Sequence, residues 1–229
     1  MPPDPTSLAE PQFILLAWAA GLALVSGFVS LARIVGPGFV WMTAPVAALV
    51  SLGAVMTGES WWARGGLVFL VLGAIWARNR PFAGVMLTIA GILFLVEAAL
   101  LGGAFAALSA TLALGGVTGE MLLGHWYLLD PSLPRWTLRT LAYAGIAGLV
   151  ADSIVLAVGG LPTGGATIAY WVLIATSIVL MAGVLGSLRY PAYSGVMAAT
   201  GLSYLAVLTT LGAVFLGRAL VAGIGPFSN

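Results

Sequence analysis

Residues 115–139, GGVTGEMLLGHWYLLDPSLPRWTLR, are where polar groups interrupt an otherwise apolar chain. The stretch contains the only histidine, His125, and a carboxylate in apolar surroundings, Glu120. It continues through a proline-containing turn to two arginines, Arg135 and Arg139. Because prolines stop helices, one apolar helix should end at this turn and another should begin after it. The rest of the chain repeats that pattern.

The composition identifies lipid as the solvent of this chain. Of 229 residues, 61% are hydrophobic and 7% are charged, and the mean hydropathy is +1.12. A soluble domain carries about 25% charged residues, so this chain cannot cover a water-facing surface. The net charge of +1 gives no sign of nucleic-acid binding. The absence of cysteine excludes disulfides and thiolate metal sites.

The apolar runs predict an all-α fold, a polytopic transmembrane helix bundle of eight spans. A span needs about 20 predominantly apolar residues, and clusters of arginine, proline and glycine separate the runs. The predicted spans are 11–31, 38–57, 61–77, 81–101, 103–128, 136–158, 167–188 and 193–221. The third is the shortest, and it requires Arg64 to extend toward the interface beside Trp61 and Trp62.

The arginines predict the orientation of these spans. One side of the membrane receives Arg33, Arg78, Arg80, Arg135, Arg139 and Arg189. The other side receives Arg64 and Arg218. Since arginine-bearing loops are typically cytoplasmic, the four odd-numbered loops should face the cytoplasm and both termini the outside. We therefore expect a multi-pass protein of the bacterial cytoplasmic (inner) membrane.

The chain forms a single integral membrane domain, 1–229, with a weak internal similarity. Residues 72–86 (LGAIWARNRPFAGVM) resemble residues 185–197 (LGSLRYPAYSGVM). Two halves of four helices, about 1–110 and 111–229, would then form a parallel repeat, as in some transporters. The alternative is that two arginine- and proline-containing hairpins independently precede an apolar helix.

Three carboxylates, Glu97, Glu120 and Asp152, lie inside predicted spans, where ionisable groups are costly and normally face the bundle interior. Glu120 and Asp152 each share a helix face with small residues that favour helix packing; these are Ala113, Gly116 and Gly124 for Glu120, and Ala144, Gly145 and Gly148 for Asp152. Glu97, near the outer end of its span, either reaches the headgroups or pairs with Arg218. The three are candidate proton-coupling groups, or they are neutral or hydrogen-bonded and fix helix register.

His125 has two interpretations. Beside Trp126 and Tyr127, it fits an aromatic belt at the membrane surface. It could equally bind a ligand or donate a proton. Quinone sites combine a histidine or tyrosine with a carboxylate and aromatic walls. The candidate ligand-binding residues are therefore Glu120, His125, Tyr127, Trp136 and Arg139.

The candidate cofactor is a quinone or a bound lipid. A single histidine excludes bis-histidine haem ligation within the chain, and no metal signature is present. The stretches GEMLLGHWYLLDPSLP (119–134) and ATGLSYLAVL (199–208) resemble uncharacterised bacterial multi-span membrane proteins. The resemblance covers about the second half of the chain, and it implies no activity.

Two functions follow from these features. The first is a non-catalytic membrane subunit of an electron-transfer or other membrane complex, with a protein partner or a second copy, and a quinone or lipid site near His125. The alternative is a small proton-coupled transporter that uses Glu120 and Asp152. A membrane enzyme is less favoured, because the sequence has no nucleophile or phosphate-binding motif and few convergent polar groups.

Overall fold

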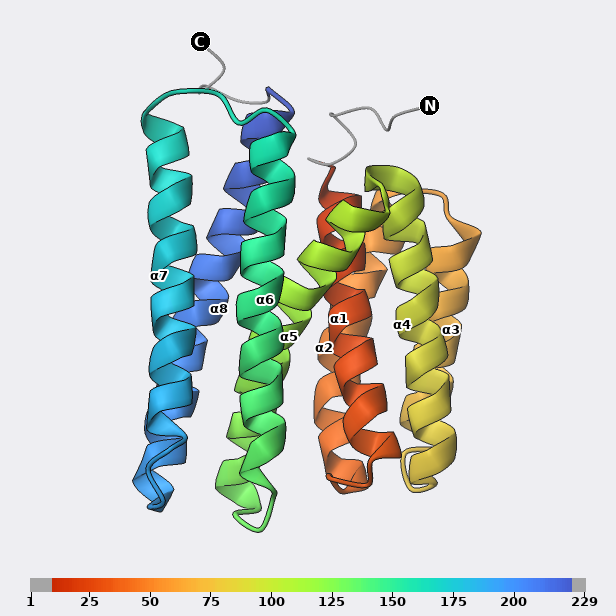
Figure 1. The fold of residues 1–229 in the computed structure, drawn as a ribbon. Coiled ribbons are helices and arrows are strands. Elements are labelled where there is room, and N and C mark those ends of the chain that lie inside the picture. Colours follow the sequence, from red (N-terminus) through yellow and green to blue (C-terminus); the bar gives the residue numbers. More distant parts are fainter. Residues whose placement is uncertain (1–9, 224–229) are drawn as a thin grey trace.

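The structure is a computed structural model that describes residues 10–223, and these residues form eight helices running alternately up and down (Figure 1). The helices are α1 (Pro11–Leu31), α2 (Pro37–Thr57), α3 (Trp61–Ile75), α4 (Arg80–Gly102), α5 (Ala104–Leu129), α6 (Arg135–Val158), α7 (Gly165–Ser187) and α8 (Tyr193–Val221). Every predicted helix is present, and its ends lie within a turn of the predicted ones. The all-α prediction is therefore confirmed.

Seven of the helices are long and apolar enough to cross a membrane, so the fold is that of a polytopic membrane protein. The exception is α3, with 15 residues. At a rise of about 1.5 Å per residue, such a helix covers about 22 Å of a hydrocarbon layer about 30 Å thick. Its start is capped by Ser60, whose hydroxyl accepts a hydrogen bond of 3.2 Å from the backbone N–H of Ala63.

The helices form two groups of four. In the first group, α1 contacts α2, α2 contacts α3, α3 contacts α4 and α4 returns to α1. The second group, α5 to α8, has the same order of neighbours. Helices α1 and α5 join the groups, which lie side by side in Figure 1. This is the arrangement that a four-plus-four repeat requires, and the repeat itself stays a prediction.

The two groups meet where α1 crosses α5 at a pair of glycines. A Cβ added to Gly21 would lie 2.5 Å from the Cα of Gly115, and one added to Gly115 would lie 2.5 Å from the Cα of Gly21. Only glycine permits so close a backbone approach. The crossing therefore fixes the distance between the two groups.

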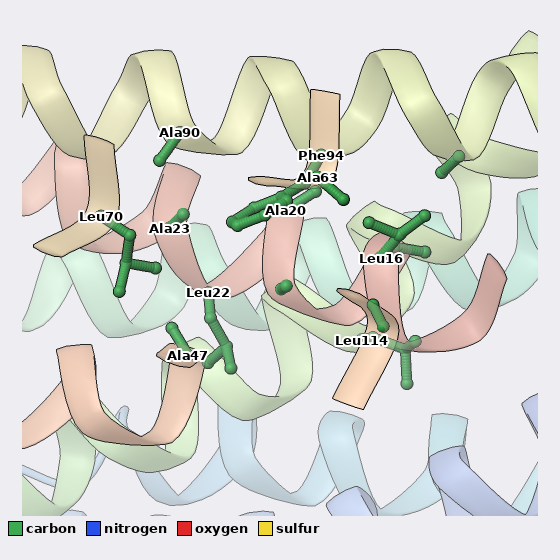
Figure 2. Packing of buried hydrophobic residues seen from close by; sticks show 14 of the residues in the cluster. Leu16, Ala20, Leu22, Ala23, Ala47, Ala63, Leu70, Ala90, Phe94 and Leu114 are labelled. Atoms are coloured by element: carbon green, nitrogen blue, oxygen red, sulfur yellow. The ribbon is translucent and has the colours of Figure 1, made fainter. Parts of the chain in front are cut away.

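Alanine and leucine side chains of α1 fill the core of the first group. Figure 2 shows them lying among side chains of α2, α3, α4 and α5. The labelled residues are Leu16, Ala20, Leu22, Ala23, Ala47, Ala63, Leu70, Ala90, Phe94 and Leu114. Large and small side chains interdigitate there, as in other close-packed interiors.

The turns α1–α2, α3–α4, α5–α6 and α7–α8 lie together at the lower end of the bundle in Figure 1. We call this the arginine-rich end, because at or beside these turns the sequence carries Arg33, Arg78, Arg80, Arg135, Arg139 and Arg189. Helix α1 begins and α8 ends at the opposite end. The chain termini themselves lie outside the described residues.

Candidate functional site

A buried ion pair joins α6 and α8 in the half of the bundle opposite the arginine-rich end. The guanidinium of Arg218 donates to both carboxylate oxygens of Asp152, at 2.7 and 2.9 Å. The two side chains are 0% and 1% exposed. Ser109 of α5 donates a third hydrogen bond to Asp152, at 2.8 Å. The ring of Phe13, from α1, lies 5.1 Å from the guanidinium carbon, so four helices meet at this ion pair.

This geometry corrects one prediction about Arg218. The residue lies within α8, as the predicted span 193–221 implies, and it is fully buried. It pairs with Asp152, so the predicted pairing with Glu97 is wrong. Glu97 was expected to lie at a similar depth to Arg218, but the helix faces bring Asp152 to the guanidinium. Glu97 is 9% exposed on α4 and does not reach out to the headgroups. The proton-coupling roles of Asp152 and Glu97 stay predictions.

Polar atoms beside the ion pair remain without partners. The hydroxyl of Tyr170 and the Nε of Arg218 are buried and have no hydrogen bond among the described residues. Gly217, next to the arginine, lies against the Tyr170 ring, where an added Cβ would be 2.6 Å from Cε2. The cluster therefore extends to α7.

Glu120 is completely buried, so the prediction that it faces another helix is confirmed. Its carboxyl makes a hydrogen bond with the hydroxyl of Ser203 on α8. The small residues on its face pack as expected. Gly116 contacts the backbone of Gly145 on α6, and Gly124 contacts Thr200 on α8.

The contacts of the Ser203 hydroxyl indicate whether the Glu120 carboxyl carries a proton. The Ser203 hydroxyl can donate only one hydrogen bond. Its oxygen lies 2.8 Å from the Ala199 carbonyl oxygen and also within hydrogen-bond distance of the Glu120 carboxyl. Both contacts are satisfied together when Glu120 carries a proton and donates it to the serine oxygen. The other carboxyl oxygen, Oε1, is buried and has no hydrogen-bond partner among residues 10–223.

His125 faces outward from the bundle. Its Nδ1 lies 3.2 Å from the hydroxyl of Tyr204 on α8, and both side chains are exposed. His125 lies five positions after Glu120 on α5, which places the two side chains about 140° apart around the helix axis. The structure therefore does not bring these two residues into one site.

Two other predicted ligand-binding residues, Tyr127 and Arg139, join Arg135 in contacts at the arginine-rich end. Arg135 donates to the hydroxyl of Tyr127 at 3.3 Å and to the carbonyl of Pro191 at 2.7 Å. Arg139 donates to the carbonyl of Leu188 at 3.0 Å. These arginines thus attach the α7–α8 turn to α6.

Trp136 is exposed, and its ring packs edge-on against Phe28 of α1, at 6.4 Å between ring centres. Since Glu120, His125 and the arginine-rich turn lie in separate surroundings, the predicted ligand-binding set divides into several places. The ligand-binding roles stay predictions.

Several partners at these sites were not identified from the sequence: Ser109, Ser203, Tyr204 and the role of Arg218. A signal was present on α8. Buried polar residues recur there at helical spacing, as Thr200, Ser203, Thr210 and Arg218. That spacing places them along one side of the helix, which faces first Glu120 and then Asp152.

Comparisons with protein-family models, curated proteins and solved structures find no match for this chain. The resemblance to bacterial multi-span proteins therefore stays a prediction. Within residues 10–223, no group of three or more histidine or acidic residues could hold a metal ion. The fold and its buried polar clusters define the class of the protein: a polytopic helical membrane protein.

Proposed function

We propose that the protein is a non-catalytic integral membrane subunit of an electron-transfer or other membrane complex, with a quinone or lipid site at His125. The observation that supports this is the exposed His125–Tyr204 pair on two helices apolar enough to cross a membrane. Polar side chains that face acyl chains lose water as a hydrogen-bond partner, which is costly. A ligand or a partner protein that meets the pair would offset that cost.

The chemistry of the pair suits a ligand with an acceptor oxygen. When the Tyr204 hydroxyl donates to Nδ1, the imidazole proton is on Nε2, which then serves as a free donor. A quinone carbonyl or a lipid phosphate oxygen matches that donor. Two features of α8 at helical spacing from Tyr204 leave room for it: Met197 is 53% exposed, and nothing lies within 4 Å of a Cβ added to Gly201.

The test uses protein extracted from the membrane and purified in detergent. Mass spectrometry identifies co-purifying subunits, and solvent extraction measures bound quinone and phospholipid. We expect wild-type protein to retain a partner and one of these ligands, and His125→Ala and Tyr204→Phe to lose the ligand. Tyr143→Phe is the matched control, because Tyr143 is an exposed tyrosine on α6. A wild-type monomer that retains no protein, quinone or tightly bound lipid would overturn the proposal.

The proposed membrane arrangement has eight spans, including α3, with both termini outside and the arginine-rich end in the cytoplasm of a bacterial inner membrane. Its support is that α3 connects opposite ends of the bundle and that six arginines gather at one end. The sequence has no cysteine, so single cysteines can be labelled cleanly. An impermeant maleimide should label Glu59→Cys in intact cells, and Asn79→Cys only after permeabilisation. Labelling of both cysteines from the same side of the membrane would contradict the proposal that α3 crosses it.

A proton-coupled transporter is the second candidate, favoured by the free Oε1 of buried Glu120. A carboxyl with a spare acceptor and a single serine contact is suited to take up and release a proton. The test is uptake into proteoliposomes driven by a pH gradient. If Glu120→Gln and Asp152→Asn leave every transport signal unchanged, the two carboxylates are not coupling groups.

A further inference from the structure

Two adjoining apolar hollows follow the outside of the contact between α2 and α3. One, of about 240 Å³, lies beside Trp41 and Ala74, toward the arginine-rich end. The other, of about 380 Å³, lies beside Leu49 and Leu52, further along α2 from the arginine-rich end. Both are lined by Pro45 and Ala48, so they form one continuous surface, the α2–α3 groove.

Small side chains create the groove. Ala44, Ala48 and Ala74 leave depth between the two helices, and buried Leu70 forms part of the floor. The rims are fully apolar and open to the outside, with Leu49 71% and Ile75 65% exposed. A surface of this kind on a membrane helix bundle faces acyl chains.

The length of the groove matches one membrane leaflet. From Trp41 to Leu52 it follows about three turns of α2, or about 16 Å. Half of a hydrocarbon layer about 30 Å thick is about 15 Å. One acyl chain of a single leaflet can therefore lie along the whole groove.

The positively charged side chain of Arg78 lies at the end of the groove nearest the arginine-rich end, where a lipid headgroup would be. The guanidinium carbon of Arg78 lies 6.0 Å from the centre of the Trp41 ring, and the ring is held by a hydrogen bond of 3.1 Å from its Nε1 to the carbonyl of Ala74. In the part of the chain that the structure describes, the exposed Arg78 side chain has no hydrogen-bond or ion-pair partner. Its donors are free for an anion, and a guanidinium binds phosphate through two parallel hydrogen bonds.

We propose that the α2–α3 groove binds an anionic phospholipid, with one acyl chain along α2 and the phosphate on Arg78. Arg80, two residues further along the chain and the first residue of α4, adds to the positive potential there. A negatively charged headgroup gains from both arginines, whereas a zwitterionic one does not gain from the net charge. This site is separate from the one proposed at His125.

The test is native mass spectrometry of the protein released from nanodiscs made of equal amounts of phosphatidylglycerol and phosphatidylcholine. We expect wild-type protein to retain phosphatidylglycerol preferentially. Arg78→Ala should lower that retention about fivefold, the effect of one arginine near a membrane surface. Ala48→Phe, which fills the groove without changing a charge, should lower the retention of the same lipid.

Arg64→Ala is the matched control. Arg64 is also an exposed arginine beside a tryptophan, 5.3 Å from the Trp61 ring, but it lies at the other end of α3. Its loss should leave phosphatidylglycerol retention unchanged. Gel filtration and circular dichroism would be used to check that each variant is folded. Equal retention in Arg78→Ala and wild type, or an equal loss in Arg64→Ala, would overturn the proposal.

Discussion

The Asp152–Arg218 ion pair offers the sharpest test of the structure. Arg218→Met removes two charged hydrogen bonds, of 2.7 and 2.9 Å, and leaves Asp152 buried with only the Ser109 hydroxyl as donor. A hydrogen bond to a charged group contributes about 1.5–3 kcal/mol, and breaking a buried pair from one side costs about 3–5 kcal/mol. We therefore expect Arg218→Met to lower the free energy of unfolding by about 3–5 kcal/mol.

The double variant Asp152→Leu/Arg218→Met distinguishes pairing from simple loss of side chains. Replacing both members of a buried ion pair with apolar residues is often neutral, so the double variant should be more stable than Arg218→Met alone. Unfolding in mixed detergent micelles, titrated with dodecyl sulfate, measures the free energies. Arg189→Met is the control, because Arg189 is exposed at the arginine-rich end. Wild-type stability in Arg218→Met, or additive losses in the double variant, would refute the ion pair.

Three further substitutions test other contacts. Gly21→Leu should lower the free energy of unfolding by about 3 kcal/mol or more, because its side chain would enter the backbone of Gly115. Glu120→Gln should change it by less than about 1 kcal/mol, since the amide N–H can donate to Ser203 where a carboxyl proton would. Ser109→Ala should lower it by about 1.5–3 kcal/mol through loss of a charged hydrogen bond. The same detergent titration measures all three.

Matched variants separate these effects from general damage. Gly186→Leu enters open space and should be tolerated. Ser153→Ala removes a hydroxyl that bonds only to its own helix, at the carbonyl of Val150, and should cost less than Ser109→Ala. A stable Gly21→Leu protein would contradict the glycine crossing. A large loss in Glu120→Gln would contradict the inference that Glu120 donates to Ser203.

The positions of the helices could be predicted from the sequence, because a chain inside lipid has few alternatives to a helix. Every backbone polar group within a membrane must be paired, so an apolar run of the right length becomes a helix. Prolines 11, 37 and 81 also lie in the first turns of α1, α2 and α4, where a missing N–H costs nothing. The small-residue faces of Glu120 and Asp152 likewise predicted which sides of α5 and α6 would pack.

The pairing of polar side chains was harder to predict, because it depends on the rotation of each helix about its axis. Depth along the helix suggested Glu97 as the partner of Arg218, but the packing of α8 between α5 and α7 brings the arginine to Asp152. Similarly, Glu120 and His125 lie close together in the sequence but on different sides of α5. The candidate quinone set assumed that nearby residues share a site, and the helical rotation separates them.

The sequence separation within the ion pair has a consequence for biosynthesis. Asp152 enters the membrane with α6, but Arg218 follows 66 residues later, near the end of the last helix that the structure describes. Until α8 is inserted, the aspartate has no guanidinium to neutralise it. A chain that stalls before α8 therefore keeps an unpaired acid in the bilayer, a defect that membrane proteases could recognise. Formation of this contact thus distinguishes a chain in which α8 has been inserted from one that stopped before it.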